Sequence, residues 1–194
     1  MKRVVIGIFG VFMLLIIILG ISAIGSYNNL VELDEDISYY YSQIENRLQE
    51  RHDKIGQILA TVIGLQEHAE TIYDAITSAR EAYANAKNSN DMEALIQADA
   101  QEALALTDVL FVVEDNPNIT ATSGFDALIY EISSMEGALS VARRDYNLSV
   151  QAYNAKVRKF PTVIVVNMFD FDKDLPYWRI NDGADEVPVI DFGD

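Results

Sequence analysis

The sequence predicts an all-α protein, with a single N-terminal transmembrane helix, a long-helix antiparallel three-helix bundle and an acidic C-terminal tail. Three observations lead to this fold class. An uncharged apolar run opens the chain, a seven-residue repeat of apolar positions follows it, and acidic residues dominate the last part. We therefore expect a short flank at 1–3, an anchor at 4–25, a helical domain at 26–161 and a tail of uncertain structure at 162–194.

The composition excludes several classes of function. The chain has 194 residues, a formal net charge of -16 and no cysteine. Nucleic acid is not an expected partner, because phosphate binding needs clustered lysine and arginine. The absence of cysteine removes disulfides, thiolate catalysis, cysteine-based zinc sites and a lipidated cysteine.

The apolar run from Val4 to Ile24 predicts a membrane span. It contains no charge and no proline, and at ~1.5 Å per residue its 21 residues can cross a hydrocarbon layer of ~30 Å. The alternative is a cleaved signal peptide, whose apolar part is usually shorter, at about 7 to 15 residues. Lys2 and Arg3 precede the run and acidic residues follow at 32–36, which favours a cytoplasmic amino terminus and an external body.

A heptad repeat predicts that the first helix after the span is long. Apolar residues alternate at spacings of four and three, which places them on one stripe of a helix that packs against partner helices. No proline interrupts the pattern, so we expect one rod-like helix from about 30 to 86. The stripe consists of Leu30, Ile37, Ile44, Ile58, Leu65, Ile72 and Ala79, interleaved with Tyr41, Leu48, Ile55, Val62, Ala69, Ile76 and Tyr83.

Two further helices complete the predicted bundle. The polar stretch 87–91 ends the first helix, and the second runs from about Met92 to Asn116, before a proline. The third spans about 125–160 and keeps the heptad rhythm, so the three helices should bury one another antiparallel. Residues 162–166 suit either a strand or the first turn of a helix after proline. The rest is expected to be a loosely held acidic tail, which aromatic residues such as Trp178 could attach to the bundle.

Arg51 is the one charged residue on the heptad stripe. A buried guanidinium must be paired, so a carboxylate on another helix is expected beside it. Counting residues along the predicted helices places Glu114 some 16 Å out of register. The expected partner is therefore on the third helix, with Glu131 preferred and Glu136 next.

No sequence pattern indicates catalysis or a cofactor. Glycine-rich phosphate loops and Gly-x-Ser-x-Gly turns are absent. Residues 170–174 have the Asp-x-Asp-x-Asp opening of a calcium loop, but Leu175 occupies the position of the turning glycine. His52 and His68 have no third ligand at a suitable spacing. We expect no catalytic residues, no metal, no cofactor and no small-molecule ligand.

Two Tyr-Asn pairs are further candidates for a structural or interaction role. Tyr146-Asn147 and Tyr153-Asn154 are seven residues apart, so they repeat on one face of the third helix. A structural role is favoured over a ligand site, with tyrosine filling the core and asparagine bonding neighbouring groups.

These pairs belong to a set of motifs by which the chain resembles the LemA family. The resemblance rests on Tyr27-Asn28-x-Leu30, Ile44-x-x-x-Leu48-x-x-Arg51, Gly64, His68, Ala79-Arg80, Val113-Glu114-x-x-Pro117, Phe125-x-x-Leu128, Glu136, Ala142-Arg143-Arg144-x-Tyr146-Asn147, Tyr153-Asn154 and Phe160-Pro161. The family usually has tryptophan at the position of Tyr41, proline and asparagine at 56–57, and tyrosine at the position of Asn116. The resemblance covers residues 1 to about 161, and the tail is hard to align.

The resemblance implies a bacterial-type, single-pass protein of the inner membrane, without a known catalytic mechanism. Relatives are associated with envelope maintenance, with membrane zinc proteases nearby in genomes, and with magnetosome membrane formation. We expect a non-enzymatic scaffold or adaptor that presents an acidic helical rod at the cell envelope to protein partners or to copies of itself. The alternative is a regulatory subunit of a membrane protease or another envelope enzyme.

Overall fold

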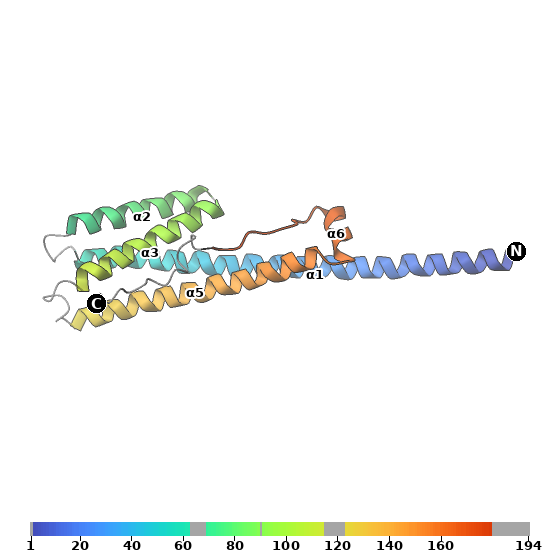
Figure 1. Ribbon diagram of the computed structural model, residues 1–194, viewed down its shortest axis with the longest axis horizontal. Coiled ribbons are helices and arrows are strands. Elements are labelled where there is room, and N and C mark those ends of the chain that lie inside the picture. Colours follow the sequence, from blue (N-terminus) through green and yellow to red (C-terminus); the bar gives the residue numbers. More distant parts are fainter. Residues whose placement is uncertain (1, 63–68, 90, 115–122, 180–194) are drawn as a thin grey trace, which may run out of the picture. The chain divides into compact units, whose positions relative to one another are not determined.

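The computed structural model describes residues 2–62, 69–89, 91–114 and 123–179. The regular secondary structure of these ranges is entirely helical, which confirms the all-α class (Figure 1). The helices are α1 (Lys2–Val62), α2 (Ala69–Ser89), α3 (Met92–Glu114), α5 (Ser123–Val157) and α6 (Thr162–Phe169).

The chain divides into two compact units. Unit 1 consists of residues 1–43 and 143–177, and unit 2 consists of residues 44–142 and the chain from 178 onward. Helices α1 and α5 each contribute a segment to both units. The predicted boundaries of anchor, helical domain and tail stay predictions.

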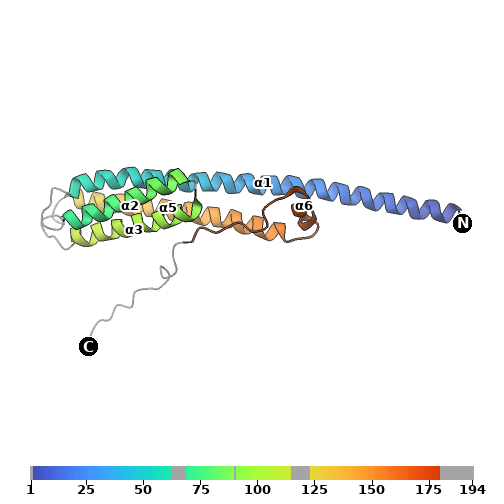
Figure 2. The ribbon, with the colours of Figure 1, turned by 90° about the horizontal axis from the view of Figure 1, so that it is seen from above.

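In its described residues, unit 2 combines four helical segments: the end of α1, all of α2 and α3, and the start of α5 (Figure 2). Its core is mainly aliphatic, with Tyr83 and Trp178 as buried aromatic residues. The heptad positions 44, 48 and 55 of α1 and 76, 79 and 83 of α2 are buried, which confirms the predicted stripe at these residues. They pack with buried residues of α3 and α5, namely Leu95, Ile96, Ala98, Ala105, Leu106, Val109, Ile132, Met135 and Leu139.

The prediction of one helix from 30 to 86, and with it the three-helix bundle, is wrong. The rings of His52 and Tyr83 lie 4.7 Å apart, centroid to centroid, whereas 31 residues of continuous helix would separate them by about 46 Å. Helix α2 therefore returns along α1 and adds a fourth segment. The seven-residue spacing of Val62 and Ala69 keeps the heptad in phase between α1 and α2, so the pattern could not indicate the reversal. Residues 63–68 lie outside the described residues.

Unit 1 pairs the amino-terminal segment of α1 with the end of α5, and α6 packs beside them. The α1 residues Leu30 and Ile37 are buried, as are the predicted heptad residues of α5, which are Tyr146, Val150, Tyr153 and Val157. The rings of Tyr41 and Tyr146 lie 6.1 Å apart. Residues 162–166, for which strand and helix were both open, belong to helix α6.

The first part of α1 is the described segment that is long and apolar enough to cross a membrane. Its large apolar side chains are exposed from Ile6 to Leu19, by 44% to 70%. Such continuous exposure is unusual for a surface in water and is consistent with a single-pass membrane anchor.

Candidate functional site

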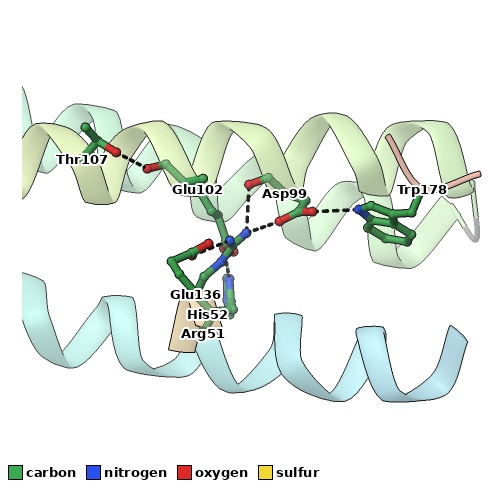
Figure 3. A network of polar contacts seen from close by, with 8 residues as sticks. Arg51, His52, Asp99, Glu102, Thr107, Glu136 and Trp178 are labelled. Carbon is green, nitrogen blue, oxygen red and sulfur yellow. Dashed lines mark hydrogen bonds and ion pairs between the residues drawn. The ribbon is translucent and has the colours of Figure 1, made fainter. Parts of the chain in front are cut away.

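The most densely bonded polar group in unit 2 surrounds Arg51, and we call it the Arg51 cluster: Arg51, His52, Asp99, Glu102, Glu136 and Trp178 (Figure 3). Arg51 projects from α1, and its side chain is only 1% exposed. Its Nη2 donates to the Asp99 carbonyl at 2.9 Å and to Asp99 Oδ1 at 2.7 Å. Its Nε donates to Glu102 Oε2 at 3.2 Å, and its Nη1 donates to Glu136 Oε1 at 2.9 Å. One guanidinium thus joins α1 to both α3 and α5.

The two fully buried carboxylates each have a second partner. Trp178 is buried, and its indole Nε1 donates to Asp99 Oδ2 at 3.0 Å. His52 Nδ1 lies 3.0 Å from Glu102 Oε1, and the His52 ring also contacts Tyr83 on α2. The cluster therefore connects all four helical segments of unit 2 with the chain at Trp178.

Three carboxylates face one guanidinium, which gives a formal charge of -2 when all are ionised and His52 is neutral. Burial raises the pKa of Glu102, and the opposing effects of Arg51 and His52 do not return that pKa to its ordinary value. Burial lowers the pKa of Arg51, but Asp99, Glu136 and Glu102 together raise it above the ordinary value. Arg51 therefore stays charged, and Glu102 takes up a proton at a higher pH than a free glutamate does.

The cluster is suited to holding the helices of unit 2 in one packing arrangement. The guanidinium of Arg51 occupies the position between carboxylates that a metal ion would take, and the side chains of Arg51, Asp99 and Glu102 are at most 1% exposed. In the described ranges, no group of three or more His, Cys, Asp or Glu residues is placed to hold a metal. Paired buried charges of this kind fix which helix faces meet, since a slipped register would leave a charge unpaired in the core.

The structure brings Arg51 and Glu136 together, and it places Glu131 elsewhere. Glu131, the preferred partner on sequence grounds, forms an ion pair with Lys54 instead. Glu114 is the last residue of α3, and its side chain is outside the described part.

Sequence reasoning missed Asp99 and Glu102. The assumed long first helix put the second helix out of reach of Arg51, whereas the reversal into α2 brings α3 back to its level. A signal was available in the sequence. The two acidic residues are three apart and lie between the buried pairs 95–96 and 105–106, so they fall on the apolar face of α3, where a buried cation is needed.

A second polar arrangement lies in unit 1, and we call it the Tyr-Asn clamp: Tyr146, Tyr153 and Asn154. The hydroxyl of Tyr146 donates to the Pro176 carbonyl at 3.2 Å, and that of Tyr153 donates to the Asp172 carbonyl at 3.0 Å. Asn154 Nδ2 donates to the Leu175 carbonyl at 2.9 Å, and the Leu175 amide donates to Asn154 Oδ1 at 2.8 Å. The clamp thus binds the main chain of 172–176 along α5.

This arrangement corrects the expectation of a loosely held tail for residues 172–178, since the clamp binds the first part and Trp178 is buried in unit 2. Burial raises the pKa of Tyr146 to about 12, with a smaller contribution from Tyr41. Burial also raises the pKa of Tyr153 to about 12, helped by nearby carboxylates. Both phenols therefore keep the protons that they donate.

The remaining candidates lie on α5 next to the clamp. Arg143 is buried, and Arg144 is exposed and donates to the carboxylate of Asp145 at 2.9 Å. Asn147 is half-buried. Of the two predicted Tyr-Asn pairs, the second contributes both members to the clamp and the first contributes its tyrosine.

The family comparison covers both polar arrangements. The LemA family matches residues 40–192, which includes the Arg51 cluster, the Tyr-Asn clamp and most of the tail that the motifs alone left unaligned. Among curated proteins, no sequence matches this chain significantly. Because the match spans more than half of the residues, the chain belongs to the LemA family.

Proposed function

We propose that this chain is a membrane-anchored, non-enzymatic scaffold or adaptor that presents an acidic helical body at the cell envelope. The observation that supports it best is the continuity of α1, a helix of 61 residues. Exposed apolar residues occupy its first part, and buried core residues such as Leu30, Ile44 and Ile55 occupy the rest. Within unit 1 the same helix runs from the exposed apolar residues into the buried core, so a helix rather than a flexible linker joins the anchor to this unit.

The Arg51 cluster supports a structural rather than a catalytic role. An active-site group must reach a substrate, yet Arg51, Asp99 and Glu102 are enclosed and bonded to one another. Arg51 and its buried carboxylate partners bind one another inside the protein. The exposed acidic residues are therefore the ones available for recognition.

The exposed acidic residues just beyond the predicted span are the first candidates for that recognition. Side chains are exposed at Glu32, Asp34, Glu35 and Asp36. This acidic band favours a partner, or a second copy of the chain, that offers a basic surface. From the charges on the two sides of the predicted span, we infer that the band lies outside the cytoplasm.

Cross-linking of the full chain in native membranes, followed by mass spectrometry, tests the proposal. We expect one discrete cross-linked species, either a homo-oligomer or a complex with one envelope protein. Replacing the four acidic residues of the band with lysine should abolish it, while replacing Glu93 and Asp108, which are exposed on α3, should not. Recovery of a monomer without cross-linked partners would contradict the proposal, and exclusive cross-links to a protease would favour the regulatory subunit instead.

A further inference from the structure

Helix α6 is apolar on two sides although only one of them is covered by protein. Its eight residues, Thr162–Phe169, carry no charge. Thr162, Val165 and Val166 are buried, whereas Val163, Ile164 and Met168 are exposed. A helix that is apolar all round normally lies in a core or in lipid, so the exposed side of α6 requires a second environment.

The exposed apolar residues lie on α6 and in the turn before it, and we call Phe160, Val163, Ile164 and Met168 the exposed stripe. Phe160, in the turn before α6, is 74% exposed, and Met168 is 69% exposed. Within α6, positions 164 and 168 are four residues apart and share a helix face, with Val163 next to them. The polar residue within this stretch, Asn167, turns its amide back to the Val163 carbonyl at 2.7 Å.

The stripe adjoins the end of the predicted membrane span within unit 1. Both ribbon views show α6 beside α1 (Figures 1 and 2). The Tyr27 ring lies 4.9 Å from that of Phe169 and 5.6 Å from that of Phe171. A groove of about 270 Å³ runs between the two helices and is lined by Ala23, Ile24, Tyr27, Met168 and Phe169. The first two of these are among the last residues of the span, so the exposed surface of α6 continues the exposed apolar surface of α1.

The charge before α6 also fits a membrane surface. Residues 146–169 contain Lys156, Arg158 and Lys159 and no acidic residue, a formal charge of +3 in a chain of -16, whereas Asp170, Asp172 and Asp174 follow α6 together with Lys173. Arg158 and Lys159 are exposed immediately before Phe160, although Arg158 also donates to Asp174. Basic residues next to exposed aromatic and aliphatic ones are typical of helices that lie at the interface of an anionic bilayer.

We propose that Phe160 and α6 form an interfacial lipid-binding helix, which inserts its exposed stripe into the same leaflet from which α1 emerges. Acyl chains then cover Ile164 and Met168 and fill the groove between α1 and α6. This inference rests on the proposed membrane anchoring by α1. It adds a second attachment, which fixes the rotation of unit 1 about the α1 axis and thereby the direction in which unit 1 presents its acidic residues at 32–36.

The absence of cysteine allows each position to be tested alone. The full chain carrying Ile164→Cys or Met168→Cys is labelled with an environment-sensitive fluorophore and reconstituted in vesicles of phosphatidylcholine and phosphatidylglycerol. We expect lipids that are brominated close to the glycerol to quench the fluorescence of both labels. We expect aqueous iodide not to quench it. Phe12→Cys, near the middle of the span, is the positive control and is read with lipids brominated near the ends of their acyl chains. Ser38→Cys, exposed on α1 about 21 Å beyond Ile24, is the negative control.

The outcomes separate this inference from the anchoring on which it rests. Quenching of the labels at 164 and 168 by iodide alone, with the label at 12 quenched by lipid, would overturn the interfacial helix and leave the anchor intact. Cross-linking of position 164 between two copies without lipid quenching would overturn it in favour of a second copy. A label at 12 that lipid does not quench would remove the anchor and this inference together.

Discussion

The two polar arrangements hold their units together in opposite ways. In unit 2, the Arg51 cluster joins charged side chains to charged side chains, so every member depends on the identity of the others. In unit 1, the Tyr-Asn clamp joins neutral side chains to main-chain groups of 172–176. Any residue can supply the three carbonyls, and any residue except proline can supply the amide at position 175. The cluster therefore fixes helix pairing, and the clamp fixes the path of a chain whose side chains are free to vary.

Removing the cation of the cluster should have the largest effect. Arg51→Met leaves the buried carboxylates of Asp99 and Glu102 without their cation, a class of change that costs about 3–5 kcal/mol. We expect unit 2 to lose its cooperative melt, followed by circular dichroism of the full chain in detergent. Arg47→Met is the matched control, because Arg47 forms an exposed pair with Glu50 that contributes about 0–1 kcal/mol. An unfolding free energy within 1 kcal/mol of wild type for Arg51→Met would show that the cluster does not stabilise unit 2.

Breaking the clamp should have a smaller and more local effect. Asn154→Ala leaves the amide and carbonyl of Leu175 without their side-chain partner, which costs about 1–3 kcal/mol for buried groups. We expect faster hydrogen exchange in residues 171–177 while the helices of unit 2 keep their protection. Gln151→Ala, an exposed position on α5, is the control. Equal loss of protection in both units would show that the clamp stabilises the whole chain and not only residues 171–177.

The pH dependence of stability distinguishes the charged arrangement from the neutral one. The pKa of Glu102 is raised in the folded chain, so its contribution is fully present below the unfolded pKa and is lost as pH rises through the folded pKa. Glu102→Gln can still accept from Arg51 and donate to His52 Nδ1, but it does not titrate. The unfolding free energy of this variant should therefore increase relative to wild type as pH rises from about 4 toward neutrality. Urea titrations of variant and wild type at successive pH values measure this trend, and a constant difference between them would contradict it.

The sequence could predict the helical class, the apolar span and most of the buried stripe because these follow from spacing alone. It could predict that Arg51 needs a carboxylate, since a buried charge is costly anywhere. It could not identify Asp99 and Glu102, because that assignment depends on the reversal between α1 and α2, which the in-phase heptad conceals. For the clamp, the sequence predicted only that the Tyr-Asn pairs share one face of the third helix and have a structural role. Its partners are main-chain groups, and these carry no side-chain signal that a sequence pattern could contain.

The smallest expected effect is the loss of one phenolic hydrogen bond from the clamp. Tyr153→Phe keeps the buried ring and removes only the donor to the Asp172 carbonyl, which costs about 0.5–1.5 kcal/mol. The sign of its pH dependence follows from the raised pKa of about 12, since the wild-type contribution is fully present below the unfolded value near 10 and disappears as pH rises through 12. Hydrogen exchange at 171–177 should thus differ between variant and wild type at pH 8, and the difference in the free energy of local opening should shrink above pH 10. Exposed Tyr130→Phe supplies the control on α5. Equal exchange in variant and wild type at pH 8 would mean that the Tyr153 hydroxyl does not hold the segment.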